Sequence, residues 1–176
     1  MIHRPVIALA SLALAAAGLI ACGERGMAAG DTGGGDARSW VLASAPADAQ
    51  GVKDAKASAQ EGESIVLRGR IGGRLEPITA GSPVFTVMDL AVPHCNQKHG
   101  DVCTTPWDYC CETPESLTAN SATVQIVDAS GRAVDESPDA AGFAPLDEVI
   151  VVGTVAARPT PDVLTIRATG LFRVMR

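Results

Sequence analysis

Most of the residues with metal-binding or redox chemistry lie close together, between positions 94 and 111. The cysteines there are Cys95, Cys103, Cys110 and Cys111, and the histidines are His94 and His99. Thiolate sulfur and imidazole nitrogen are ligands for zinc, copper and iron–sulfur clusters. The spacing matches neither the paired C-x-x-C of structural zinc sites nor the Cys/His pairs of a Rieske centre. One interpretation is therefore a metal or metal-cluster site of undetermined type, with the histidines as possible ligands.

The second interpretation is a pair of structural disulfides. Four cysteines allow three connectivities, and bonding between the adjacent Cys110 and Cys111 is unfavourable because neighbouring side chains diverge. Two pairings remain open: Cys95–Cys110 with Cys103–Cys111, or Cys95–Cys111 with Cys103–Cys110. Each disulfide would close a short loop, for which the chain-entropy model gives a stabilisation of about 2–3 kcal/mol.

Catalysis by a cysteine is a third and weaker interpretation. The chain has no C-x-x-C pair, and no general base can be assigned to a thiol from the sequence. Ser-x-x-Lys, Gly-x-Ser-x-Gly and phosphate-loop patterns are also absent. We therefore predict a protein without enzymatic activity.

The choice between metal binding and disulfides depends on the redox conditions of the cellular compartment. The N-terminus indicates which compartment this is. Arg4 is followed by an apolar run that is shorter than the ~20 residues of a membrane-spanning helix, which is the layout of a secretory signal. The run ends in Leu-Ile-Ala-Cys at residues 19–22, which resembles the lipobox of bacterial lipoproteins. That resemblance implies removal of residues 1–21, lipid on Cys22 and an oxidising cell-envelope location. Gly23 is not the Asp that retains many lipoproteins on the inner membrane, so the periplasmic side of the outer membrane is favoured.

Residues 22–60 are expected to form a flexible tether. They contain a Gly-rich stretch and lack apolar periodicity, so they bury too little surface to offset their ordering entropy. Two exceptions are left open: the apolar patch at 39–42 could dock on the domain, and 47–60 could form a weak helix. The formal net charge of −6 argues against a nucleic-acid partner. The membrane is the expected partner, and any protein or small ligand is unknown.

The folded domain is expected at residues 61–176 and to be all-β. Five segments show strand patterns separated by turn residues, at 64–71, 84–90, 122–128, 148–156 and 163–174. Their spacing and the V-x-V-x-G-x-V pattern near Gly153 resemble an OB-fold, which implies a small five-stranded barrel. Another small barrel or a sandwich is the alternative. Arg68 and Arg70 on the first strand and Arg74 in the loop after it form a basic stripe. We expect this stripe on a solvated strand face.

A long Cys-rich insert, residues 91–121, would connect the second and third strands. Long ordered loops in compact domains are usually functional or specially stabilised. Residues 105–111 read T-P-W-D-Y-C-C, which is similar to a segment of uncharacterised exported bacterial proteins and implies no activity. Trp107 and Tyr109 are expected to cover the cysteines. The sequence thus predicts a lipid-tethered barrel that displays this loop for ligand, metal or partner binding. The alternative is a redox or electron-transfer protein that holds a metal or iron–sulfur cluster.

Overall fold

The computed structural model of the protein describes residues 38–98, 100 and 102–175. The predicted signal peptide, Cys22, the Gly-rich stretch and His99 lie outside these residues. Within the described part of the chain, no helix has the length and apolar character needed to cross a membrane.

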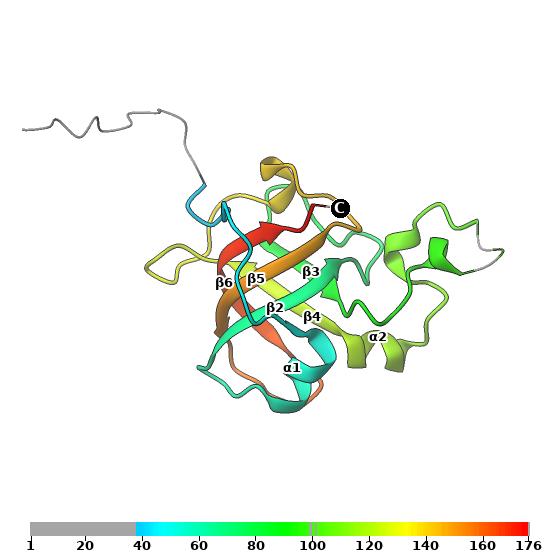
Figure 1. Ribbon diagram of the computed structural model, residues 1–176, viewed down its shortest axis with the longest axis horizontal. Helices are drawn as coiled ribbons and strands as arrows, with labels where there is room; N and C mark the ends of the chain where they lie inside the picture. Colours follow the sequence, from blue (N-terminus) through cyan, green and yellow to red (C-terminus); the bar gives the residue numbers. More distant parts are fainter. Residues whose placement is uncertain (1–37, 99, 101, 176) are drawn as a thin grey trace, which may run out of the picture. The chain divides into compact units, whose positions relative to one another are not determined.

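Five strands close into a barrel, which confirms the predicted OB-like architecture (Figure 1). They are β2 (Ser64–Ile71), β3 (Val84–Met88), β4 (Ser121–Ile126), β5 (Glu148–Val155) and β6 (Thr165–Arg173). The hydrogen-bonded order is β2-β3-β4-β6-β5, and pairing of β2 with β5 closes the sheet. Strands β4 and β6 run parallel, whereas the other neighbours in the barrel are antiparallel.

Period-two alternation builds the barrel core. In β4, Ala122, Val124 and Ile126 are buried while the residues between them are half-buried, because successive side chains of a strand point to opposite faces. Gly153 lies where the pairing of β5 with β6 shifts register. A Cβ at Gly153 would lie 2.3 Å from the Arg167 carbonyl oxygen, so a glycine is needed for the close approach of the two strands.

The segment 38–60 is part of the folded domain, which corrects the prediction of a tether up to residue 60. Both exceptions left open there, docking of 39–42 and a helix within 47–60, are present. It contains β1 (Gln50–Gly51), which pairs with β2, and α1 (Val52–Ser58). Trp40 is buried with its ring 6.1 Å from that of Phe143, and the Leu42 amide donates to the Leu171 carbonyl. The elements here are too short to show a periodicity, so only the burial of isolated apolar side chains reveals that they belong to the core.

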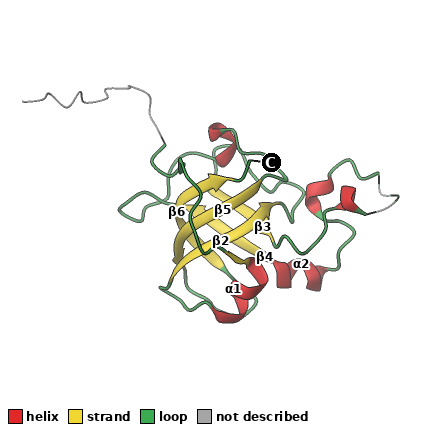
Figure 2. Cartoon of the chain, viewed as in Figure 1, coloured by secondary structure: helices red, strands yellow, loops and turns green. Residues whose placement is uncertain are grey.

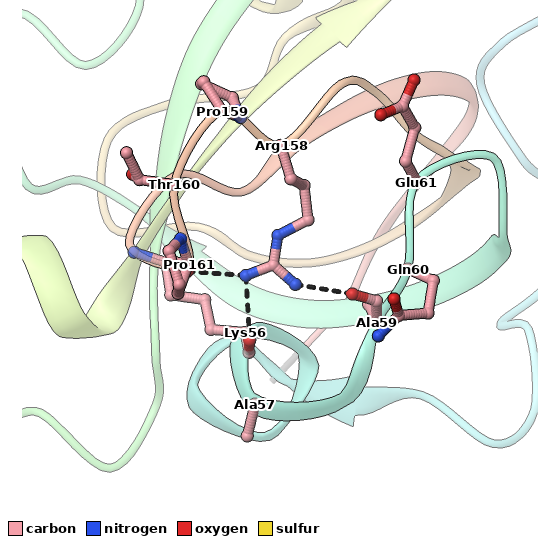
Figure 3. Close-up of a pocket in the computed structure, with 9 residues that line it drawn as sticks. All are labelled: Lys56, Ala57, Ala59, Gln60, Glu61, Arg158, Pro159, Thr160 and Pro161. Carbon is pink, nitrogen blue, oxygen red and sulfur yellow. Dashed lines mark hydrogen bonds between the residues drawn. The ribbon is translucent and has the colours of Figure 1, made fainter.

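Arg158 fastens α1 to the connection between β5 and β6. Its guanidinium donates to the carbonyl oxygens of Lys56, Ala59 and Pro161 beside an open hollow of about 450 Å³ (Figure 3). The Lys56 ammonium donates to the Asp162 carbonyl at 2.7 Å. Burial lowers the pKa of Lys56. Both cations that line this hollow are therefore engaged by main-chain oxygens, and they hold its two sides together.

The insert between β3 and β4 is partly helical, although a plain loop was expected. It contains η1 (Cys95–Gln97), η2 (Pro106–Asp108) and α2 (Pro114–Asn120), and a fourth short helix, η3 (Pro138–Ala141), precedes β5. The Thr113 hydroxyl caps α2 by accepting from the Ser116 amide, and Pro114 occupies the first helical position. Helices α1 and α2 lie side by side at one end of the barrel (Figure 2).

Candidate metal centre

The insert is fastened to the barrel at the end of β2. The Gly73 amide, at a positive φ of 90°, donates to the Trp107 carbonyl at 2.7 Å, and the Trp107 indole donates to the Leu75 carbonyl. A Cβ on Gly72 would lie 2.7 Å from that Trp107 oxygen and 2.8 Å from the Tyr109 ring. Tyr109 is fully buried and packs with Met88 in a small second core. The glycines therefore allow the insert to lie directly against the barrel wall.

A turn centred on Asp108 shapes the part of the insert that carries Cys110. One Asp108 carboxylate oxygen accepts from the Cys110 amide and the other from the Thr105 hydroxyl, both at 2.8 Å. Tyr109 has the left-handed φ of 57°, which reverses the chain between them. Burial acts to raise the pKa of Asp108, but these hydrogen bonds outweigh it and lower the pKa. The carboxylate is therefore ionised at neutral pH.

The four sulfurs form one cluster. The Sγ atoms of Cys95 and Cys111 are 2.8 Å apart, and Cys110 Sγ lies 3.7 Å from Cys95 Sγ and 3.6 Å from Cys103 Sγ. One ligand atom from each of Cys95, Cys103, Cys110 and Asp108 lies within 4.8 Å of the others. A tetrahedral zinc ion with Zn–S bonds of about 2.3 Å holds its sulfurs about 3.8 Å apart. The spacings of Cys110 to Cys95 and Cys103 are close to that value.

The thiols differ in their ease of ionisation. Burial acts to raise the pKa of Cys95, but hydrogen bonds from Cys111, Cys110 and Cys103 outweigh it and lower the pKa. The pKa of Cys110 is raised because its proton is shared with Cys103, with Cys95 and with Asp108. Cys95 is fully buried, Cys103 is half-buried, and Cys110 and Cys111 are exposed. The buried Cys95 thiol is thus easier to ionise than an ordinary cysteine, and the exposed Cys110 thiol is harder to ionise.

An ion pair borders the cluster. The Lys98 ammonium lies 2.6 Å from a Glu112 carboxylate oxygen, whose partner oxygen accepts from the Ser116 hydroxyl. The hydrogen bond to Glu112 raises the pKa of Lys98, and the negative charges of Cys111 and Cys95 act in the same direction. The pair therefore joins η1 to the start of α2 on the side of the cluster near Cys111.

The predicted site residues have different outcomes. Cys95, Cys103 and Cys110 converge with a carboxylate, and Cys111 lies against Cys95. His94 is half-buried and supplies no atom to this ligand group. Among the two predicted cover aromatics, Tyr109 lies in the insert's own core and Trp107 is half-buried against the barrel. His99 lies outside the described residues.

Sequence reasoning missed two residues of this region. Asp108 was not among the predicted ligands, although an acid two residues before Cys110 is a detectable signal for a turn that could also bind metal. Arg70 was expected on a solvated face together with Arg68, but Arg70 is only 5% exposed, which corrects that prediction. The insert covers it, and no local pattern predicts which part of a strand face a distant loop will cover.

Comparisons with known proteins identify no family. No family model matches the chain, and no curated protein matches it. A similar solved structure is that of the hypothetical protein ygiW from E. coli, with 14% sequence identity, a TM-score of 0.38, and coverage of 72% of this chain and 90% of that one.

Proposed function

We propose that the protein is a lipid-anchored cell-envelope protein whose OB-like barrel presents a thiolate site for a single thiophilic metal ion, with zinc as the best fit. The observation that carries the proposal is the convergence of Cys95, Cys103, Cys110 and Asp108 ligand atoms within 4.8 Å. Three sulfurs and one carboxylate oxygen are a ligand set that Zn²⁺ accepts in tetrahedral geometry. A carboxylate is a poor ligand for the softer Cu⁺.

The distances also favour a mononuclear centre over an iron–sulfur cluster. In a 2Fe–2S cluster each iron binds two of the cysteines, and in a 4Fe–4S cluster each iron binds one, so no more than two cysteine sulfurs share one ion. Here Cys110 Sγ lies within 3.7 Å of both Cys95 Sγ and Cys103 Sγ. These separations suit sulfurs that share one small ion, so the electron-transfer alternative is the less favoured of the two metal interpretations.

The second candidate is a loop closed by two disulfides for partner binding. The 2.8 Å contact between Cys95 and Cys111, together with 3.6 Å between Cys103 and Cys110, favours one of the two predicted pairings. A cell-envelope location would supply the oxidising conditions. In this candidate Asp108 only shapes the turn and binds no ion.

The state of the four cysteines is tested on the mature full-length protein, extracted from bacterial membranes in mild detergent. Metal content, intact mass under non-reducing conditions and accessible thiols are measured on the same sample. We expect one zinc ion per chain and a mass without disulfides. Two disulfides and no bound metal would refute the metal proposal and support the second candidate.

Two serine variants separate the candidates further. Cys110→Ser removes a proposed ligand, so zinc binding and the visible band of a Co²⁺ substitute should be lost. Cys111→Ser is the matched comparison, because Cys111 lies outside the converging group although its Sγ contacts Cys95 Sγ. This variant should keep the Co²⁺ band, with an affinity closer to wild type than that of Cys110→Ser. If Cys111→Ser leaves Cys95 as a reactive thiol in a metal-free protein, the pairing of Cys95 with Cys111 is a disulfide and the proposed centre is wrong.

The lipid anchor is proposed from the lipobox and needs its own test. Cys22→Ser should leave an unprocessed precursor, whereas the wild-type protein should fractionate with membranes and carry acyl groups on its N-terminal peptide by mass spectrometry. Because Gly23 follows the lipidated cysteine, we expect the outer membrane on sucrose-gradient separation. A wild-type protein that is cleaved elsewhere and lacks lipid would refute the anchor.

A further inference from the structure

Arg70 and Arg68 occupy the same face of β2 but have opposite environments. Arg68 is exposed, and its Nε lies 2.8 Å from a Glu148 carboxylate oxygen. Only 5% of Arg70 is exposed. Its Nε and Nη1 atoms have no hydrogen-bond partner within the described chain. None of the ion pairs formed by described residues includes Arg70. Glu148 lies opposite Arg70 in the pairing of β2 with β5, but its carboxylate is bonded to Arg68. Arg70 is thus a buried cation that forms no ion pair with another described residue.

The Cys-rich insert covers Arg70 through Tyr109. Arg70 is paired with Met88 in the register of β2 and β3, and Met88 packs against the fully buried Tyr109. The Tyr109 ring also lies against Gly72, two residues beyond Arg70. In the chain, Tyr109 lies directly between two of the proposed ligands. The insert therefore places the proposed centre next to the side chain that covers Arg70.

A buried guanidinium needs a counter-charge. Removing it from water is costly unless an anion or several acceptors compensate. The proposed centre would provide that anion, because three thiolates and one carboxylate carry more negative charge than one divalent ion neutralises. Lys98 borders the same cluster but is already paired with Glu112 at 2.6 Å. Among the described residues, Arg70 is thus a cation near the cluster that forms no ion pair with a carboxylate.

We propose that Arg70 is the built-in counter-charge of the thiolate metal centre, a positioning residue that favours a complex with net negative charge and binds no metal itself. This inference rests on the proposed function. It implies that the centre keeps a net negative charge when a divalent ion is bound by all four anionic ligands.

The experiment compares Arg70→Met, Arg70→Lys and Arg68→Met in the full-length reduced protein. Co²⁺ affinity is measured by its sulfur-to-metal absorbance band in competition with a chelator. Because partners of metal ligands are typically worth about 10–100-fold in affinity, we expect a loss of that size in Arg70→Met. Arg70→Lys, which keeps the charge, should recover most of it, and the exposed control Arg68→Met should match the wild type.

Thermal unfolding separates a counter-charge from a merely structural role. In the metal-free reduced protein, Arg70→Met should unfold at the same or a higher temperature than wild type, because an uncompensated buried charge is removed. Its stabilisation by Zn²⁺ should be smaller than that of wild type. Equal Co²⁺ affinity in wild type and Arg70→Met, or equal losses in Arg70→Met and Arg70→Lys, would overturn the inference while leaving the metal site intact. A wild-type protein that binds no Co²⁺ would instead refute the proposed function.

Discussion

The barrel and the Cys-rich insert are stabilised in different ways. The barrel buries a large apolar cluster to which all five of its strands contribute, and paired backbones close it into a ring. The insert has a core of Met88, Val92 and Tyr109, with Leu117 packed against it. Its remaining order comes from Asp108, the Lys98–Glu112 pair and the sulfur contacts. The comparison indicates that apolar burial and strand pairing stabilise the barrel, whereas the geometry of the insert depends more on polar contacts and on the chemistry of its sulfurs.

The largest effect is expected from a cavity in the barrel. Leu67 lies fully buried in β2, so Leu67→Ala should lower the free energy of unfolding by about 2–5 kcal/mol. Urea denaturation followed by circular dichroism measures this loss. The Co²⁺ absorbance of the still-folded protein should be unchanged, and a lost metal site would show that the two regions are not independent.

The junction between the two regions is tested at Gly72. A Cβ there meets the Trp107 carbonyl and the Tyr109 ring, so Gly72→Ala should push the insert off the barrel at a cost of about 1–3 kcal/mol. Hydrogen exchange should speed up in residues 91–120 more than in β4 to β6. Gly170→Ala is a control, because its Cβ meets only the flexible Leu42 side chain. A uniform increase of exchange across the barrel would contradict a separable insert.

Acidification should affect the insert selectively. Metal binding must displace the proton of Cys110, whose pKa is raised, so affinity falls as the pH falls. Each displaced proton corresponds to about tenfold in affinity for each pH unit below the thiol pKa. Asp108 contributes little to this dependence near neutral pH because its pKa is lowered and it is already ionised. Zn²⁺ competition titrations between about pH 6 and 8 measure how strongly the affinity depends on pH. An affinity independent of pH would contradict thiolate ligation.

The smallest effect is expected at Val102, which is 92% exposed next to Cys103. Val102→Ser should change the free energy of unfolding by no more than about 0.5 kcal/mol, because the side chain loses little contact on unfolding. Co²⁺ affinity should also be that of the wild type. A clear weakening of either would mean that the outer edge of the insert is packed more tightly than its exposure indicates.

The strands were predictable because their information is local. The segment 64–71 was predicted with the bounds that β2 has, and 148–156 extends only one residue beyond β5. Alternation of apolar and polar residues specifies the buried face of a strand, and turn residues mark its ends. Docking of the apolar patch at 39–42 could be anticipated from its composition, but its partner could not, since Trp40 contacts Phe143 across a long sequence separation.

For the candidate site, the sequence by itself determined the sulfur donors, which are four thiols in one insert. Only the tertiary structure decided that Cys95 meets Cys110 and Cys111, that Asp108 turns toward them, and that Arg70 is buried beneath the insert. The physical reason is the sequence separation over which each property is determined. Residue chemistry and strand periodicity are properties of neighbouring positions, whereas burial and charge compensation depend on which distant segments the closed barrel brings into contact.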